Sequence, residues 1–374
     1  MNIFDTNCLL YHPEIFEDFE NVVIPYTVLE ELDKLKTDKI TGYTARRAVR
    51  KIKDNNIRCR DFNKSHDFTD DALLEIIEEN GGTLYSNDYL VYLKGKAREL
   101  NVQLYDPQLD TYKGVVEKQI EPSQLDKMMK HNNIGWSGEN LDVNTYIDFN
   151  KVIGKYKEGT VFKIPWSNKH KVNGIDTLNN RQIMAYDALT DSSIKVVVLW
   201  GKAGTGKTAL ATKLAMQQMR SEKYDNVLLS RPNIEIGEEL GILPGGIEDK
   251  QSPFIAPFKD NMSSIQLSSV PEIQPLSTVK GRDIKDTFYV IDEAQDIPPE
   301  NIITLVERMG EGSKIIFTGD VRQIDKNGLT PKYNGITFLS NALRGSELFA
   351  CIELTEVERS ETAKLGDKLR ENLN

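Results

Sequence analysis

The stretch between residues 196 and 215 constrains the fold of this chain more than any other. It opens with an apolar run, Val196–Trp200, that is typical of a buried strand, and it continues with the loop GKAGTGKT. The apolar residues that follow recur at helical spacing. Strand, glycine loop and helix start together form the context in which the pattern G-x-x-x-x-G-K-[ST] cradles phosphates. A glycine turn before an ordinary helix is the alternative interpretation.

The residue types of this loop indicate a nucleotide-binding chemistry. Glycines allow backbone N–H groups to turn inward around phosphates, and the N-terminus of the helix adds partial positive charge. Lys207 is expected to reach the β- and γ-phosphates of ATP, and Thr208 to hold Mg²⁺. The predicted phosphate-binding residues are Gly201, Ala203, Gly204, Thr205, Gly206, Lys207 and Thr208.

Composition limits the remaining possibilities. A chain of 374 residues, 39% hydrophobic and 28% charged, is ordinary for a soluble globular protein of two or three domains. Three widely separated cysteines without a CxxC pair indicate a reducing compartment and no zinc site. We find no signal peptide and no long apolar span, so we expect a cytoplasmic protein without a membrane partner. The net charge of −10 excludes a protein that coats nucleic acid by bulk charge.

Residues 1–106 alternate short strands and helices, which predicts a small α/β domain. Strands are expected at 2–4, 22–24, 83–86 and 102–105, with helices between them. One of these helices, 43–53, is rich in arginine and lysine. This helix either binds along an RNA backbone or is a solvent-exposed basic face whose charge is balanced by the acidic rest of the chain.

Four acidic residues stand at the ends of these elements: Asp5, Glu31, Asp71 and Asp88. Strand ends gather on one edge of a parallel α/β sheet, where crowded carboxylates repel one another unless cations bind. Mg²⁺ and Mn²⁺ prefer such oxygen ligands and activate water for attack on a phosphodiester. Each acid taken singly is also explained as a turn, helix-start or surface residue.

The pieces FDTN, VVIPYTVLEELDKLK, DDALLEI and LYSND resemble, in order, the PIN-domain nucleases. These are metal-dependent ribonucleases that usually cut single strands. The resemblance implies that Asp5 is catalytic and that the metal ligands are Asp5, Glu31, Asp71 and Asp88.

Two of these ligand positions have an acidic neighbour. Glu30 competes with Glu31, and Asp70 competes with Asp71. We favour the second residue of each pair because it directly precedes apolar residues of its predicted helix.

Residues 107–170 show weak periodicity and many turn residues. They predict a connector followed by a small β-rich subdomain, with short strands at 146–150 and 159–164. The aromatic residues of this stretch form either a small core or a surface on which bases stack.

Residues 171–374 contain further apolar strands at 226–230, 287–291, 314–318 and 351–354. The strand at 287–291 ends in two acids. We expect Asp292 to hold the Mg²⁺ shell through water and Glu293 to orient the attacking water. After the next strand, Asp320 and Gln323 are placed to sense the γ-phosphate.

Other residues of this segment carry weaker signals. Gln182, shortly before the phosphate-loop strand, resembles the adenine-reading glutamine of helicase-like ATPases. Arg231, Arg282 and Arg359 lie near strand or loop ends. Each of these three is a candidate arginine finger that acts on the ATP site of a neighbouring subunit. Alternatively, each contacts RNA or forms a surface salt bridge.

The pieces GKAGTGKT, SRPNIEIGEELGILPG, EIQPLSTVKGRDIKDTFYVIDEAQD, FTGDVRQID and LTEVERS resemble, in order, the PhoH-like ATPases. Together with the first segment they make the chain similar to PIN–PhoH fusions. The resemblance implies a PIN-like α/β domain followed by a RecA-like P-loop NTPase domain with a parallel sheet. It also implies an RNA helicase, dependent on ATP and Mg²⁺ or Mn²⁺, that is coupled to a ribonuclease.

Chain length adds an expectation about assembly. After Thr318 too few residues remain for a second RecA-like core, so a neighbouring subunit must complete the ATP site. We therefore expect a homo-oligomeric ring, with six subunits as the expected number. Three other interpretations stay open: an RNA-binding ATPase motor with an inactive PIN platform, a nucleotide-switched ribonuclease without unwinding, and a small-molecule kinase.

Overall fold

The computed structural model describes residues 1–12, 15–17, 19–37, 42–64, 69–105, 111–165, 178–232, 258, 271–276, 279 and 283–357. The chain divides into two compact units. The first comprises Met1–Asp110 with Lys326–Tyr333, and the second comprises Thr111–Asp325 with Asn334–Asn374. No helix within the described ranges is long and apolar enough to cross a lipid bilayer.

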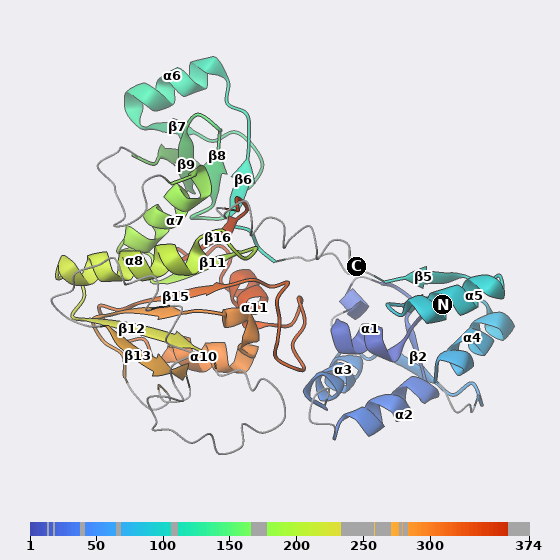
Figure 1. Cartoon of the computed structure of the whole chain (residues 1–374). Coiled ribbons are helices and arrows are strands. Elements are labelled where there is room, and N and C mark those ends of the chain that lie inside the picture. Colours follow the sequence, from blue (N-terminus) through green and yellow to red (C-terminus); the bar gives the residue numbers. More distant parts are fainter. Residues whose placement is uncertain are drawn as a thin grey trace, which may run out of the picture. The chain divides into compact units, whose positions relative to one another are not determined.

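The first unit is built from short parallel strands with helices between them (Figure 1). Its strands are β1 (Asn2–Phe4), β2 (Val23–Pro25), β3 (Arg58–Arg60), β4 (Thr83–Ser86) and β5 (Val102–Leu104). Its helices are α1 (Thr6–Tyr11), the short η1 (Ile15–Glu17), α2 (Tyr26–Leu35), α3 (Gly42–Asp54), α4 (Thr69–Asn80) and α5 (Tyr89–Ala97). The strands pair in the orders β1-β4-β5 and β2-β3, and a single bridge between Asn2 and Val22 joins β1 to β2.

The core of this unit follows the apolar pattern of the sequence. Ile3 and Phe4 of β1 and the apolar residues of α4 are buried. Polar residues then begin the helices. Asp5 caps α1 and Asp88 caps α5, because each side chain accepts a hydrogen bond from the backbone N–H two residues further on. Helix capping thus places these two acids at the carboxyl ends of β1 and β4.

A five-stranded sheet begins the second unit. Its strands are β6 (Val115–Glu117), β7 (Asn133–Gly135), β8 (Tyr146–Asp148), β9 (Ile153–Lys157) and β10 (Thr160–Lys163), in the order β6-β8-β9-β10-β7. Strands β8 and β10 lie where the sequence predicts them, whereas helix α6 (Pro122–His131) was not predicted. Tyr146 and Ile153 share one apolar cluster with the larger sheet of this unit, so this subdomain packs directly on that sheet.

The larger sheet has six parallel strands in the order β13-β12-β14-β15-β11-β16. They are β11 (Val196–Gly201), β12 (Asn226–Arg231), β13 (Glu272–Pro275), β14 (Thr287–Ile291), β15 (Lys314–Gly319) and β16 (Phe349–Leu354). Helices α7 (Asn180–Thr190) and α8 (Lys207–Arg220) lie on one side of the sheet, with α10 (Pro299–Glu307) and α11 (Gly335–Ala342) on the other (Figure 1). The predicted parallel α/β architecture is confirmed.

Strand register decides which residues meet at the edge of this sheet. Trp200 of β11 lies opposite Gly319 of β15, and Ile291 of β14 lies opposite Ser230 of β12. All of these strands are parallel, so the residues that follow them emerge at one edge. The phosphate loop, the two acids after β14 and the loop after β15 are therefore neighbours.

Candidate nucleotide and metal sites

The phosphate loop owes its shape to glycines in backbone conformations that side chains disfavour. Gly201, Gly204 and Gly206 have φ angles of +148°, +82° and +84°. A Cβ at Gly201 would lie 2.0 Å from the carbonyl oxygen of Leu354. No other residue type fits this position without moving β16.

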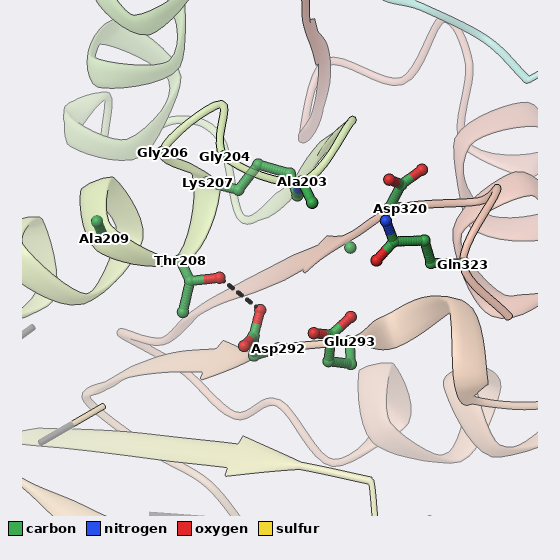
Figure 2. A pocket seen from close by; sticks show the side chains of 11 residues that line it. Ala203, Gly204, Gly206, Lys207, Thr208, Ala209, Asp292, Glu293, Asp320 and Gln323 are labelled. Carbon is green, nitrogen blue, oxygen red and sulfur yellow. Dashed lines mark hydrogen bonds between the residues drawn. The ribbon is translucent and has the colours of Figure 1, made fainter. Parts of the chain in front are cut away.

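A cavity of about 280 Å³ opens at the phosphate loop (Figure 2). Its lining comes from the loop and helix α8, from the end of β14 and from the loop after β15. The residues are Ala203, Gly204, Gly206, Lys207, Thr208, Ala209, Asp292, Glu293, Gly319, Asp320 and Gln323. The structure therefore brings together the phosphate-binding lysine, the two acids and the two proposed γ-phosphate sensors.

Lys207 lies inside the loop that precedes it. Its Nζ donates hydrogen bonds to the carbonyl oxygens of Gly201, at 2.7 Å, and Lys202, at 2.9 Å. The side chain is buried, so these acceptors offset the cost of removing the ammonium from water. Phosphate oxygens that enter the cavity would compete for the same three protons.

Asp292 is held by two threonines. Thr208 Oγ1 and Thr318 Oγ1 both donate to Asp292 Oδ1, at 2.8 Å and 2.5 Å, and Figure 2 shows the first of these bonds. The bonds join the phosphate loop, β14 and β15 through one carboxylate oxygen. Thr208 and Asp292 both line the cavity at the phosphate loop. A hydroxyl beside a carboxylate is an oxygen donor set that suits Mg²⁺.

Glu293 occupies a strained position next to Asp292. Its φ angle of +54° is uncommon for a residue with a side chain. Its Oε1 pairs with the Arg231 guanidinium at 2.7 Å, and its Oε2 accepts a hydrogen bond of 2.7 Å from Gln295. Burial and the adjacent Asp292 carboxylate raise the pKa of Glu293, although Gln295 and Arg231 act in the opposite direction.

Gln295 is a residue of this site that the sequence analysis missed. Its Nε2 donates to Glu293 and also to the carbonyl oxygen of Gln323 at 2.9 Å, while its Oε1 accepts the backbone N–H of Asp320 at 3.1 Å. It is only 1% exposed. The available signal was a glutamine two residues after the acidic pair. Such an amide, once buried, needs several hydrogen-bond partners.

The structure places the other predicted residues less directly. Gln182 is buried, accepts the backbone N–H of Asn179 at 3.2 Å and donates to the carbonyl oxygen of Thr205 at 3.3 Å. It thus contacts the phosphate loop through the Thr205 carbonyl, and it is not among the residues that line the cavity. Arg282 and Arg359 lie outside the described residues.

Two acids of the first unit, Asp5 and Asp88, lie at the carboxyl ends of β1 and β4, while Glu31 comes from α2. Asp5 is 1% exposed and accepts a hydrogen bond of 2.8 Å from Ser86 Oγ. Glu31 accepts a hydrogen bond of 2.6 Å from Thr6 Oγ1. Burial raises the pKa of Asp5 to about 6, and the negative charges of Asp70 and Glu31 add to this, although the Ser86 hydrogen bond opposes it.

Asp70, rather than the favoured Asp71, interacts electrostatically with the other acids of this edge. Asp71 forms an ion pair of 3.0 Å with Lys94 and lies 3.9 Å from Arg98. Burial and the negative charges of Asp88 and Glu31 raise the pKa of Asp70. We therefore replace Asp71 with Asp70 in the proposed ligand set. The two residues are adjacent on α4, so they point to different sides of the helix.

The donor chemistry of these acids suits a hard divalent cation. The candidate ligands Asp5, Glu31, Asp70 and Asp88 offer carboxylate oxygens only. The Asp5 carboxylate is buried, and burial and the charges of Asp70 and Glu31 raise its pKa. A bound cation would offset that buried negative charge. Among the residues whose placement is described, no three His, Cys, Asp or Glu side chains are grouped closely enough to hold a metal ion as they stand.

Comparisons with known proteins identify the family and the two domains. The model of the PhoH-like protein family matches residues 174–366, which is just over half of the chain. The chain belongs to the PhoH-like family. A PIN domain model matches residues 2–106. The protein is thus a PhoH-like P-loop ATPase with an N-terminal PIN domain, as the sequence predicted.

Two relatives of this PhoH-like chain match it along nearly its whole length. Protein PhoH2 of Bacillus subtilis (strain 168) is 29% identical, over 98% of this chain and 99% of that protein. Protein PhoH2 of Thermobispora bispora is 26% identical, over 99% and 96%. Among solved structures, the Pif1 helicase from Candida albicans is 18% identical, covers 53% of this chain and 44% of that one, and has a TM-score of 0.30. That likeness is too distant to support a functional argument.

Proposed function

We propose that this protein couples ATP-driven RNA unwinding to metal-dependent cleavage of single-stranded RNA. The observation that carries the ATPase part is the arrangement around Asp292. One carboxylate joins the phosphate loop to two strands, and it lines a cavity together with Lys207 and Glu293. This arrangement suits transfer of a phosphoryl group to water.

Each residue then has a proposed task. Lys207 binds the β- and γ-phosphates, and Glu293 accepts a hydrogen bond from the water that attacks the γ-phosphorus as the bond to the ADP oxygen breaks. Thr208 and Asp292 would hold Mg²⁺, which when bound neutralises charge on the phosphates. Asp320 and Gln323 register the presence or loss of the γ-phosphate.

The nuclease part rests on the acids of the first unit. Asp5 would be the central ligand, with Glu31, Asp70 and Asp88 around it. When bound, Mg²⁺ or Mn²⁺ would activate water for attack on the RNA phosphodiester. The two activities complement each other because unwinding supplies single strands and the nuclease cuts them.

Assembly is part of this proposal. The described residues of the second unit contain one six-stranded parallel sheet, so a group from a neighbouring subunit would complete the ATP site. We propose a homo-oligomeric ring, with a hexamer as the expected form. Native mass spectrometry with and without ATP tests it. Full ATPase activity in a purely monomeric sample would contradict it.

A labelled, partly duplex RNA tests the coupled function. The RNA is incubated in Mg²⁺ or Mn²⁺, with and without ATP, with wild-type protein, Asp5→Asn and Lys207→Ala. We expect cleavage to require Asp5. We also expect it to extend into the duplex only when ATP and Lys207 are both present. If cleavage never depends on Asp5 while ATP turnover depends on Lys207, the PIN unit is an RNA-binding platform on an ATPase motor.

A further inference from the structure

The Glu293 carboxylate is held from two directions. Arg231 Nη2 lies 2.7 Å from Oε1, and Gln295 Nε2 donates to Oε2 at 2.7 Å. Hydrogen bonds to charged groups are among the stronger polar contacts in proteins. Two such contacts fix the direction in which this side chain points, and they compete with any water that needs the same oxygens.

Gln295 is itself fixed by the opposite wall of the cavity. Its amide bonds to the backbone of Asp320 and Gln323, in the loop that follows β15. Gly319 leaves room for it, because a Cβ there would lie 2.1 Å from Gln295 Oε1. Gln295 therefore connects Glu293 rigidly to the loop that carries the proposed γ-phosphate sensors.

Arg231 approaches Glu293 from another side. It is the last residue of β12, next to β14 in the sheet, and it is absent from the described residues that line the nucleotide cavity. Its side chain is 24% exposed and is therefore partly accessible from solvent. A guanidinium that already binds one oxyanion is also suited to a phosphate, which it can bind through two parallel hydrogen bonds.

We propose that Arg231 holds Glu293 in a resting position, and that a backbone phosphate of RNA draws Arg231 away and releases the carboxylate for the attacking water. Gln295 keeps the released carboxylate aligned with the loop after β15. Both are positioning residues, and ATP turnover becomes fast only when RNA is bound. The inference rests on the proposed role of Glu293 in orienting water.

This assignment predicts the opposite effect on the ATPase rate from an arginine finger that acts on a neighbouring subunit. A finger stabilises the transition state, so its removal slows turnover under every condition. A residue that restrains Glu293 instead slows the RNA-free enzyme, so its removal speeds that enzyme and abolishes further stimulation by RNA.

Steady-state ATPase measurements on the full chain distinguish these cases. Wild type, Arg231→Gln and Arg231→Lys are compared over a range of ATP concentrations, with and without a uridine homopolymer. We expect Arg231→Gln to raise the RNA-free kcat by about tenfold, in line with the loss of a charged hydrogen bond. Its rate should then be insensitive to RNA. Arg231→Lys keeps the positive charge and should retain a low RNA-free rate and part of the stimulation.

Two further variants complete the experiment. Arg344→Gln removes an exposed arginine that is ion-paired with Asp142 and should behave as wild type. Gln295→Ala should lower kcat with and without RNA while the KM for ATP changes little. Thermal melting and binding of a non-hydrolysable ATP analogue establish that each variant is folded.

An RNA-free kcat of Arg231→Gln at or below the wild-type value overturns the proposal, as does a wild type whose rate RNA leaves unchanged. A lower kcat together with weaker binding of ADP–beryllium fluoride would instead assign Arg231 to the γ-phosphate. A separate measurement tests the premise that Glu293 orients the attacking water. Normal ATP turnover by Glu293→Gln would contradict that premise.

Discussion

Thr208 donates a hydrogen bond of 2.8 Å to Asp292, which joins the phosphate loop to the end of β14. The two residues come from distant parts of the sequence and meet because β11 and β14 both flank β15 in one parallel sheet. This contact is the geometric basis for assigning them to a common cation. It also makes the assignment testable, because each partner can be changed without moving a strand.

Thr208→Ala should lower kcat for ATP hydrolysis by roughly 100-fold, since it removes one group that stabilises transition-state charge. The matched control is Thr212→Ala, one turn further along α8. The buried Thr212 hydroxyl has no hydrogen-bond partner within the described part of the chain, so its loss should leave turnover unchanged. Steady-state ATPase assays at several Mg²⁺ concentrations check both. If the two variants hydrolyse ATP at comparable rates, Thr208 is not a ligand of the cation.

Asp70→Asn should abolish RNA cleavage, whereas Asp71→Asn should preserve it. Asp70 carries charge toward the acid cluster, while Asp71 pairs with Lys94 through side chains that are 31% and 37% exposed. Loss of such a pair costs about 1 kcal/mol or less. Cleavage of a labelled single strand in Mn²⁺, together with thermal melting, checks both effects. The reverse pattern would restore Asp71 as the ligand.

The choice between Asp70 and Asp71 could not be predicted from the sequence alone. The apolar spacing of 69–80 predicts helix α4, but the direction of each acidic side chain depends on Lys94 of α5, which only the packed structure brings near. Gln295 is a similar case. Its role depends on contacts between the end of β14 and the loop after β15, and spacing along the chain does not reveal such contacts.

The central strands of the large sheet and the phosphate loop were predictable for a physical reason. Each is encoded locally, by an apolar run or by glycines whose spacing fits one function, and β11, β14 and β15 lie where those patterns place them. Helix α6 and the strands β3, β6, β7, β9 and β13 were not predicted. Strand β13 is at the edge of its sheet, and α6 lies in a stretch of weak periodicity, so neither carries a strong apolar signal.

Gly201→Ala should abolish ATP binding and destabilise the second unit by about 3 kcal/mol or more, because it combines a disfavoured φ with a clash against the backbone of Leu354. Gly159→Ala separates the two causes. Gly159 has a φ of +77°, and no atom of the described residues lies within 4 Å of the point that a Cβ would occupy there. Its substitution should cost about 1 kcal/mol and leave ATP binding intact. Equal losses in the two variants, measured by denaturant unfolding, would contradict the steric argument.

Asp5 should make the stability of the protein depend on pH in a defined direction. Its pKa is about 6 in the folded chain, against 3.8 for an unperturbed aspartate. The folded state thus binds this proton more tightly than the unfolded state. The resulting stabilisation is fully present below pH 3.8 and is lost as the pH rises through about 6. The loss amounts to about 3 kcal/mol, from 1.36 kcal/mol per pKa unit.

Asp5→Asn removes this dependence because the amide does not ionise. In EDTA, the free energy of unfolding of the variant should exceed that of wild type at pH 8, and the difference should shrink toward pH 4. Mn²⁺ should stabilise wild type at pH 8 and leave the variant almost unchanged, because a bound cation offsets the same buried charge. Equal responses of the two proteins to Mn²⁺ would show that Asp5 is not a ligand, whatever the outcome of the cleavage assays.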